Sequence, residues 1–218
     1  MINSWNKLDI KTYRELYRIT SNFFLKDDDK RLHIAALLNG ISYDELLEQP
    51  IADTLEMMKC LNFLEERPKA EKIRKEYQIG GKTYCPIMDA GDMTTAQYID
   101  YQAIATETFE EHLLDLMSII MVPKGHIYND GYDRKEVMAD LDRLTVTEAL
   151  GIADFFIKRY RRSLTLTLLY SDAVMRMAVM KAPKEARPQM RELRKKHSRQ
   201  VGELLTMFGS LSLKQLLK

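Results

Sequence analysis

Acidic residues and a histidine gather in one stretch of the chain, and they are the first candidates for chemistry. Glu107, Glu110, Glu111 and Asp115 surround His112 at the spacing of successive helical turns. Helical bundles hold di-iron centres with such residues, but they do so through Glu-x-x-His pairs. The residues three positions before the four histidines are Lys30, Phe109, Pro123 and Arg194. The missing glutamates argue against a metal site and favour a solvated acidic face with a core or interface histidine.

Other catalytic patterns are also absent from the sequence. It has no G-x-S-x-G elbow and no H-E-x-x-H helix, and Gly81-Lys82 lacks the upstream glycine of a phosphate-binding loop. Cys60 and Cys85 form no C-x-x-C pair, which argues against a zinc site or a disulfide framework. His126 is the strongest remaining candidate, but nothing near it in sequence is suited to orient its ring. We therefore expect no catalytic, cofactor-binding or metal-binding residues, and predict that the chain is not an enzyme.

The C-terminal region is locally basic, although the whole chain carries a net charge of only +1. Candidate contacts for nucleic acid or an acidic partner are its cations: Lys181, Lys184, Arg187, Arg191, Arg194, Lys195, Lys196 and Arg199. Only Glu185 and Glu192 oppose them, and no aromatic residue interleaves with them to stack on single strands. A solvated helix face and a surface that neutralises phosphates or an acidic protein both remain open. Arg159, Arg161 and Arg162 form a second basic group.

Methionine is abundant, with 13 residues, and Met175, Met177 and Met180 fall on one predicted helix. Methionine fills irregular gaps in a core and also lines adaptable binding surfaces. The sequence leaves both roles open, as core or as a contact with another subunit or a client protein.

Composition places the chain among globular proteins. Of its 218 residues, 45% are hydrophobic and 30% are charged, which is enough apolar material for a core. Only 9 glycines and 6 prolines interrupt it, and this scarcity favours long helices. Residues 1–7 lack the apolar stretch of a signal peptide, and no apolar run is long enough for a membrane span. We expect a protein kept in the cytosol, or in a particle assembled there.

Apolar spacing and cap residues predict a mainly α fold that would position these residues. Capping boxes at residues 42–45, 94–97 and 145–148 mark three helix starts. The predicted helices cover residues 8–19, 27–39, 42–49, 51–66, 94–121, 134–141, 145–180 and 185–208. Residues 163–168 alternate polar and apolar side chains as a strand does, but both flanks are helical, so we favour helix there.

One β-hairpin is predicted near residues 76–88, because Gly80-Gly81 separates two short apolar runs. A lone hairpin is marginal in water and must pack on helices or on a partner. The candidate subunit contacts are therefore Tyr77, Ile79, Tyr84 and Ile87. The predicted fold class is a multi-helix bundle with this one small hairpin inserted. We expect one compact unit made of an N-terminal helical section 1–70, the hairpin 71–90 and a long-helix bundle 91–218.

Several segments resemble a known group of proteins. They are Ala35–Leu47, Ile79–Lys82 with Tyr84, Met93–Gln102, Pro123–Gly125 and Gly151–Phe156. Together they resemble small helical proteins encoded among the virion genes of crAss-like and related tailed phages. The resemblance spans roughly residues 30–160 and consists of cap and turn motifs. It implies a role in assembly or structure, near the portal and tail or as a tail assembly chaperone, and implies no catalytic residues.

The leading hypothesis is a non-enzymatic structural component of a tailed-phage virion, assembled in the host cytoplasm. It would be a portal or tail-region ring subunit or an internal cargo protein, in multi-copy contact with itself and other virion proteins. A first alternative is a tail assembly chaperone that covers an aggregation-prone tail protein through its Met-rich faces. A second is contact with packaged DNA through the basic C-terminal helix, with an affinity that falls steeply with salt.

Overall fold

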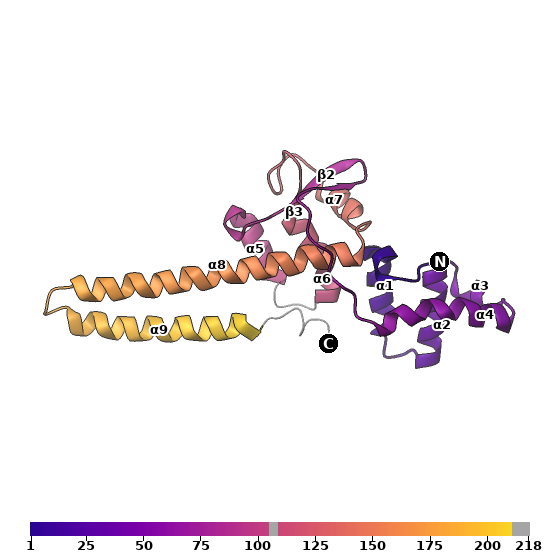
Figure 1. Ribbon diagram of the computed structural model, residues 1–218, viewed down its shortest axis with the longest axis horizontal. Coiled ribbons are helices and arrows are strands. Elements are labelled where there is room, and N and C mark those ends of the chain that lie inside the picture. The colour runs from indigo at the N-terminus through magenta and orange to yellow at the C-terminus, as the bar shows by residue number, and fades with distance from the viewer. Residues whose placement is uncertain (105–108, 211–218) are drawn as a thin grey trace. The chain divides into compact units, whose positions relative to one another are not determined.

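The structure is a computed structural model that describes residues 1–104 and 109–210 (Figure 1). In these residues the fold is mainly helical with a small antiparallel sheet, which confirms the predicted fold class. The helices are α1 (Ile10–Thr20), α2 (Asp27–Asn39), α3 (Tyr43–Leu47), α4 (Ile51–Met58), α5 (Thr95–Ile104), α6 (Phe109–Ile120), α7 (Arg134–Leu141), α8 (Val146–Lys181) and α9 (Arg187–Ser210). The strands are β1 (Tyr77–Ile79), β2 (Lys82–Pro86) and β3 (Met121–Pro123).

Local sequence signals set most helix ends. The Asp9 carboxylate accepts a hydrogen bond from the Thr12 N–H at 2.7 Å and caps α1. Gly40 ends α2 in the left-handed conformation, with φ of 73°. The predicted capping box before α3 is confirmed, since the Ser42 hydroxyl and the Glu45 carboxylate each accept the other residue's backbone N–H. The predicted helix 51–66 is α4 followed by a 3-10 segment, Lys59–Glu65.

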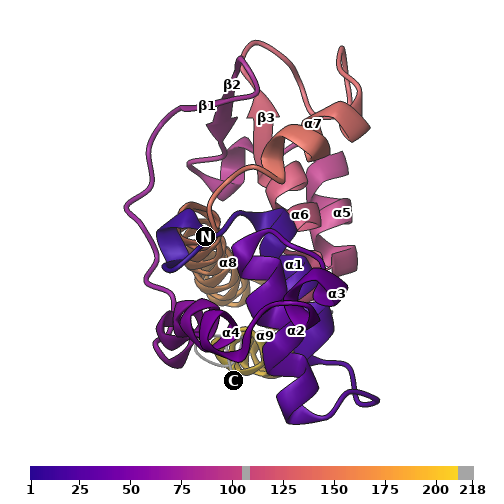
Figure 2. The same cartoon turned by 90° about the vertical axis from the view of Figure 1, so that its right-hand side faces the viewer.

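The helix predicted over residues 94–121 was wrong as one continuous element. The Gln97 side-chain amide donates to the Ile119 carbonyl at 2.8 Å, whereas 22 residues of straight helix would separate them by about 33 Å. The described residues instead form α5 and α6, which lie side by side (Figure 2). Residues 105–108 lie outside the described part of the chain. The sequence of residues 94–121 has a continuous apolar pattern because α5 and α6 each bury one face.

The sheet contains a strand that the sequence analysis missed. Strands β1 and β2 form the predicted hairpin, pairing Tyr77 with Tyr84 across Gly80-Gly81. Strand β3 then pairs antiparallel with the other edge of β2, and Tyr84 lies opposite Pro123. Strand β3 follows directly after α6, and the sequence places Met121 at the end of the predicted helix 94–121 because its apolar pattern runs on to that residue. The third strand supports the hairpin within the chain itself.

The chain forms two compact units: unit 1 is Met1–Ile87 with Met93–Phe155, and unit 2 is Met88–Asp92 with Phe156–Lys218. Helix α8 is unbroken through residues 163–168, which confirms the helix favoured there over a strand. The expected sections 1–70, 71–90 and 91–218 do not coincide with these units, because the first turns of α8 belong to unit 1 and the rest to unit 2.

Unit 1 joins its N-terminal segment to the start of α8 by backbone pairing. The Ile10 N–H donates to the Leu144 carbonyl at 2.9 Å, and the Val146 N–H donates to the Leu8 carbonyl at 2.8 Å. Leu8, Ile10 and Val146 are fully buried. This pairing fixes where α1 and α8 begin.

An extended segment, residues 66–76, connects the helices of the N-terminal region to β1, and we call it the strap (Figure 2). Its Glu71 N–H donates to the Thr147 carbonyl at 2.9 Å. The strap backbone passes so close to α8 that a β-carbon at Gly151 would lie 2.1 Å from the Glu71 carbonyl oxygen. Gly151 therefore has no room for a side chain.

Candidate interaction surfaces of the helical hairpin

Of the acidic stretch considered first, the described side chains are Glu111, His112 and Asp115 on α6. The His112 Nδ1 atom lies 3.1 Å from the Asp115 carboxylate, one turn along α6. Glu107 and the side chain of Glu110 lie outside the described residues. In the part of the chain that the structure describes, no group of three or more His, Cys, Asp or Glu residues is placed to hold a metal ion.

The other candidate nucleophiles and bases are Cys60, Cys85 and His126, and each packs against neighbouring residues of the fold. Cys60 is buried beside the Asn39 amide, and burial raises the pKa of its thiol, which disfavours the reactive thiolate. Cys85 is half-buried in β2. The His126 ring meets the edge of the Tyr132 ring and lies against Gly131 in the same loop.

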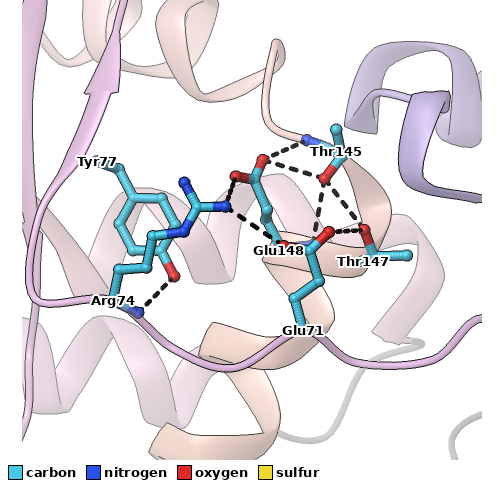
Figure 3. Close-up of polar contacts among 6 residues, drawn as sticks. All are labelled: Glu71, Arg74, Tyr77, Thr145, Thr147 and Glu148. Carbon is cyan, nitrogen blue, oxygen red and sulfur yellow. Dashed lines mark hydrogen bonds and ion pairs between the residues drawn. The ribbon is translucent and has the colours of Figure 1, made fainter.

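The polar cluster of unit 1 holds the strap on α8 (Figure 3). The Arg74 guanidinium lies 3.3 Å from the Glu71 carboxylate and 2.9 Å from that of Glu148. Glu71 also accepts from the Thr147 hydroxyl at 2.9 Å. Glu148 closes the predicted capping box at the start of α8 by accepting from the Thr145 N–H at 3.2 Å. Each charged group of the cluster thus has a structural partner, as at a junction between two segments.

The hairpin residues expected to contact another subunit are buried inside the chain. Tyr77, Ile79 and Tyr84 are only 4%, 8% and 0% exposed. The Tyr84 hydroxyl donates to the Asp140 carboxylate at 2.8 Å, and the Ile87 N–H donates to a backbone carbonyl at the end of α6. Ile87 alone remains half-exposed. The three buried side chains are core residues of unit 1, with Tyr84 held against Asp140 of α7.

The eight basic residues of the C-terminal region do not form one patch. The Arg187 guanidinium is engaged with the Ala182 carbonyl at 3.0 Å near the end of α8. Arg199 pairs with Glu203 at 3.1 Å on an exposed part of α9. Lys196 lies beside Leu193 and Glu192, on a different surface from the other cations. Lys181 and Lys184 are exposed at the turn between the helices.

Three of the predicted residues do come together, with one residue that the sequence analysis missed. Arg191, Arg194 and Lys195 of α9 line a groove with Arg176 of α8. The groove has a volume of about 700 Å³, and its remaining lining is Val179, Met180 and Ser198. We call it the basic groove. Helices α8 and α9, which form it, run side by side as a helical hairpin within unit 2 (Figure 1).

A second surface of this hairpin is apolar. The exposed apolar residues of α8 in unit 2 follow helical spacing: Leu166, Tyr170, Val174, Met177 and Met180. At 3.6 residues per turn these positions share one face of the helix. We call this face the α8 stripe. On the opposite face of α8, Ser171 contacts His197 of α9 and Val179 is buried. Helix α8 therefore has two apolar faces, and α9 covers only one of them.

The contact between α8 and α9 includes a carboxylate whose charge stabilises it. The Ser198 hydroxyl donates to Asp172 at 2.6 Å, and Arg176 donates to the same carboxylate at 2.7 Å. These two partners hold the pKa of Asp172 below its ordinary value. The folded hairpin therefore favours the carboxylate form over the acid.

We expect the contribution of Asp172 to be present above about pH 4, the ordinary pKa region of aspartate, and lost as the pH falls through the lower folded-state pKa. Asp172→Asn should reduce the melting temperature of the α8–α9 helices at pH 7, and its difference from the unaltered chain should shrink near pH 3. Circular dichroism at 222 nm measures both. Glu192→Gln is the control, since Glu192 pairs with Lys195 of its own helix. A difference that stays constant with pH would contradict this assignment.

Comparison with known protein families, curated proteins and solved structures finds nothing that matches this chain. Among the described residues, no helix is both long enough and apolar enough to cross a lipid bilayer. The basic groove and the α8 stripe are the surfaces of the helical hairpin that bear on function.

Proposed function

We propose that this chain is a non-enzymatic structural protein of a tailed-phage particle, and that it assembles in several copies through the α8 stripe. The resemblance of residues 30–160 to virion-associated phage proteins supports the setting. The observation that carries the mode of action is the apolar face of α8 that α9 leaves uncovered. Exposed apolar patches of this kind mark protein interaction sites.

The stripe is suited to a second copy of the same chain. Its five side chains are uncharged and recur at steps of four and three residues, so two identical stripes can pack side by side as helices. Tyr170 and Met180 are 71% and 67% exposed, and each would gain from burial. Exposed Arg162 and Lys181 flank the stripe, so pairing places like charges at its ends. Salt should therefore strengthen the association by screening this repulsion.

The oligomeric state tests this mode of action. Light scattering coupled to size exclusion should show more than one copy for the unaltered chain, and Val174→Glu should weaken association at least about tenfold by burying a charge in the interface. Leu193→Glu is the matched control, because Leu193 is an exposed apolar residue of α9 outside the stripe. A monomeric unaltered chain, or equal dissociation of both variants, would contradict the proposal.

The particle itself tests the proposed setting. Quantitative mass spectrometry of purified virions, calibrated on the major capsid protein, should find the chain in stoichiometric amounts. A copy number matching a ring symmetry would identify a connector or tail component. A much larger number would identify internal cargo. Absence of the chain from the particles would refute the structural role.

A tail assembly chaperone is the second candidate, and exposed Met177 and Met180 favour it. Flexible methionine surfaces adapt to varied apolar partners. In this case the stripe would cover a tail protein before maturation and leave with no trace in the particle. Co-expression should then raise the solubility of that tail protein, and Val174→Glu should abolish the effect.

A further inference from the structure

We infer that the basic groove between α8 and α9 binds the phosphate backbone of double-stranded DNA. The groove is basic where the α8 stripe is apolar, although Met180 belongs to both, and the inference does not rest on the proposed assembly.

Two arginines of the groove are available to a ligand. In the described residues, neither Arg191 nor Arg194 forms an ion pair, and both side chains line the groove. The planar guanidinium group matches phosphate geometry through two parallel hydrogen bonds. Arg194 lies near enough to Asp172 to help lower the pKa of that carboxyl, but it forms no direct ion pair with it, and Arg191 has no acidic partner among the described residues. Both guanidinium groups can therefore donate to a bound anion.

The carboxylates near the groove are already neutralised. Asp172 is held by Arg176 and the Ser198 hydroxyl, and Glu192 is held by Lys195 at 2.8 Å. An incoming anion meets no uncompensated negative charge from these residues. Because the net charge of the chain is only +1, attraction to DNA must arise locally, in this groove.

The spacing of the cations favours a regular polyanion. Arg191 lies about 4.5 Å along the axis of α9 from Arg194 and about 6 Å from Lys195, so the three cations share one face within about one turn. A sugar–phosphate backbone offers such a regular row of charges, and a protein that neutralises it gains affinity without reading sequence. Guanidinium groups pair with phosphate through two parallel hydrogen bonds, so we favour DNA, and an acidic protein is left as an outcome of the test.

The lining of the groove indicates a duplex over a single strand. Its apolar part is Val179 and Met180, and no aromatic side chain lines it within the described residues. Sequence-tolerant binding of single strands depends on stacking of bases on aromatic rings. The groove offers no such platform, and the phosphates of an intact duplex remain as the feature it can contact.

Fluorescence anisotropy with a labelled 20-base-pair duplex of mixed sequence tests the inference on the full chain. Arg191→Ala/Arg194→Ala should weaken binding at least about tenfold at 0.1 M salt, and should reduce the slope of log affinity against log salt by about 2. The control removes the same charge from another part of the same helix, as Lys196→Ala/Arg199→Ala, and should change affinity by less than about threefold. Circular dichroism should show equal helix content in both variants.

Other outcomes would overturn the inference. It fails if the unaltered chain does not bind the duplex at 50 mM salt, or if both double variants lose affinity equally. Tighter binding of poly-L-glutamate than of duplex would instead identify an acidic protein ligand, and tighter binding of a single strand would refute the duplex. Val174→Glu should keep the salt slope of the unaltered chain, so that failure of assembly and failure of DNA binding are separately visible.

Discussion

Gly151→Ala is expected to lower the free energy of unfolding of unit 1 by about 3 kcal/mol or more. The new β-carbon would lie 2.1 Å from the Glu71 carbonyl oxygen and 3.2 Å from the Glu71 nitrogen. Both are backbone atoms, so no side-chain rotation can relieve the overlap. The strap must move away from α8, and the Glu71 bond to the Thr147 carbonyl is then lost or stretched.

Thermal unfolding followed by circular dichroism measures this effect, and a loss of about 3 kcal/mol corresponds to a drop in melting temperature of roughly 6–12 °C. Gly202→Ala is the matched control. Gly202 also lies inside a long helix, but nothing is within 4 Å of its β-carbon position. Alanine should therefore raise helix stability there by about 1 kcal/mol. If both alanines stabilised the protein, the strap would not lie on α8 as described.

Gly80→Ala should destabilise unit 1 by about 3 kcal/mol, through two separate effects. Gly80 has φ of 60°, a left-handed conformation that costs an alanine about 1 kcal/mol. Its β-carbon would also lie 2.1 Å from the Asp140 carboxylate. That carboxylate cannot move freely, because it accepts from the buried Tyr84 hydroxyl and lies 4.0 Å from both Lys82 and Arg143.

Gly81→Ala separates the two effects, because Gly81 has a similar φ of 79° and nothing within 4 Å of its β-carbon position. Urea unfolding should show a loss of about 1 kcal/mol for Gly81→Ala and the larger loss for Gly80→Ala. Equal losses would mean that the Asp140 carboxylate does not press on the turn. Burial and the neighbouring Asp140 raise the pKa of Tyr84, so its hydroxyl stays protonated and donates to Asp140. The difference between Gly80→Ala and Gly81→Ala should therefore be the same across neutral pH.

The helix starts were predictable from sequence because their signals are local. A capping box is closed by residues three positions apart, and each of the three predicted boxes forms both of its hydrogen bonds. Gly80-Gly81 likewise specifies its turn by backbone conformation alone. These features require no knowledge of what packs on them.

The elements that the sequence did not reveal depend on distant partners. Helices α5 and α6 lie side by side, and the bond that joins Gln97 to Ile119 demonstrates it. Strand β3 has only three residues and becomes a strand because β2 offers it an edge. The spacing of apolar residues within the segment predicts neither the packing of α5 on α6 nor the strand β3. The burial of Tyr77 and Tyr84 could not be predicted for the same reason, because it depends on the distant segments that pack against the hairpin.

The basic groove was only partly predictable. Charge counting identified Arg191, Arg194 and Lys195, but it also included Arg187, which bonds to backbone carbonyls near the end of α8. It missed Arg176, because that residue joins the others only through the pairing of α8 with α9. The α8 stripe was similarly hidden. A helix with apolar residues on two faces is predicted to be a buried core helix. Only the position of the partner helix shows which face stays exposed.

The pairing of residues 8–10 with residues 144–146 constrains the order in which the chain can fold during its synthesis. The first of these segments emerges from the ribosome about 136 residues before its partner does. At 5–20 residues per second this delay is roughly 7–27 s, far longer than the microseconds a helix needs to form. During that interval α1 can form, but Leu8 and Ile10 remain in water. The nascent chain is then most accessible to chaperones and proteases. The fold of unit 1 is completed only when the start of α8 has been synthesised.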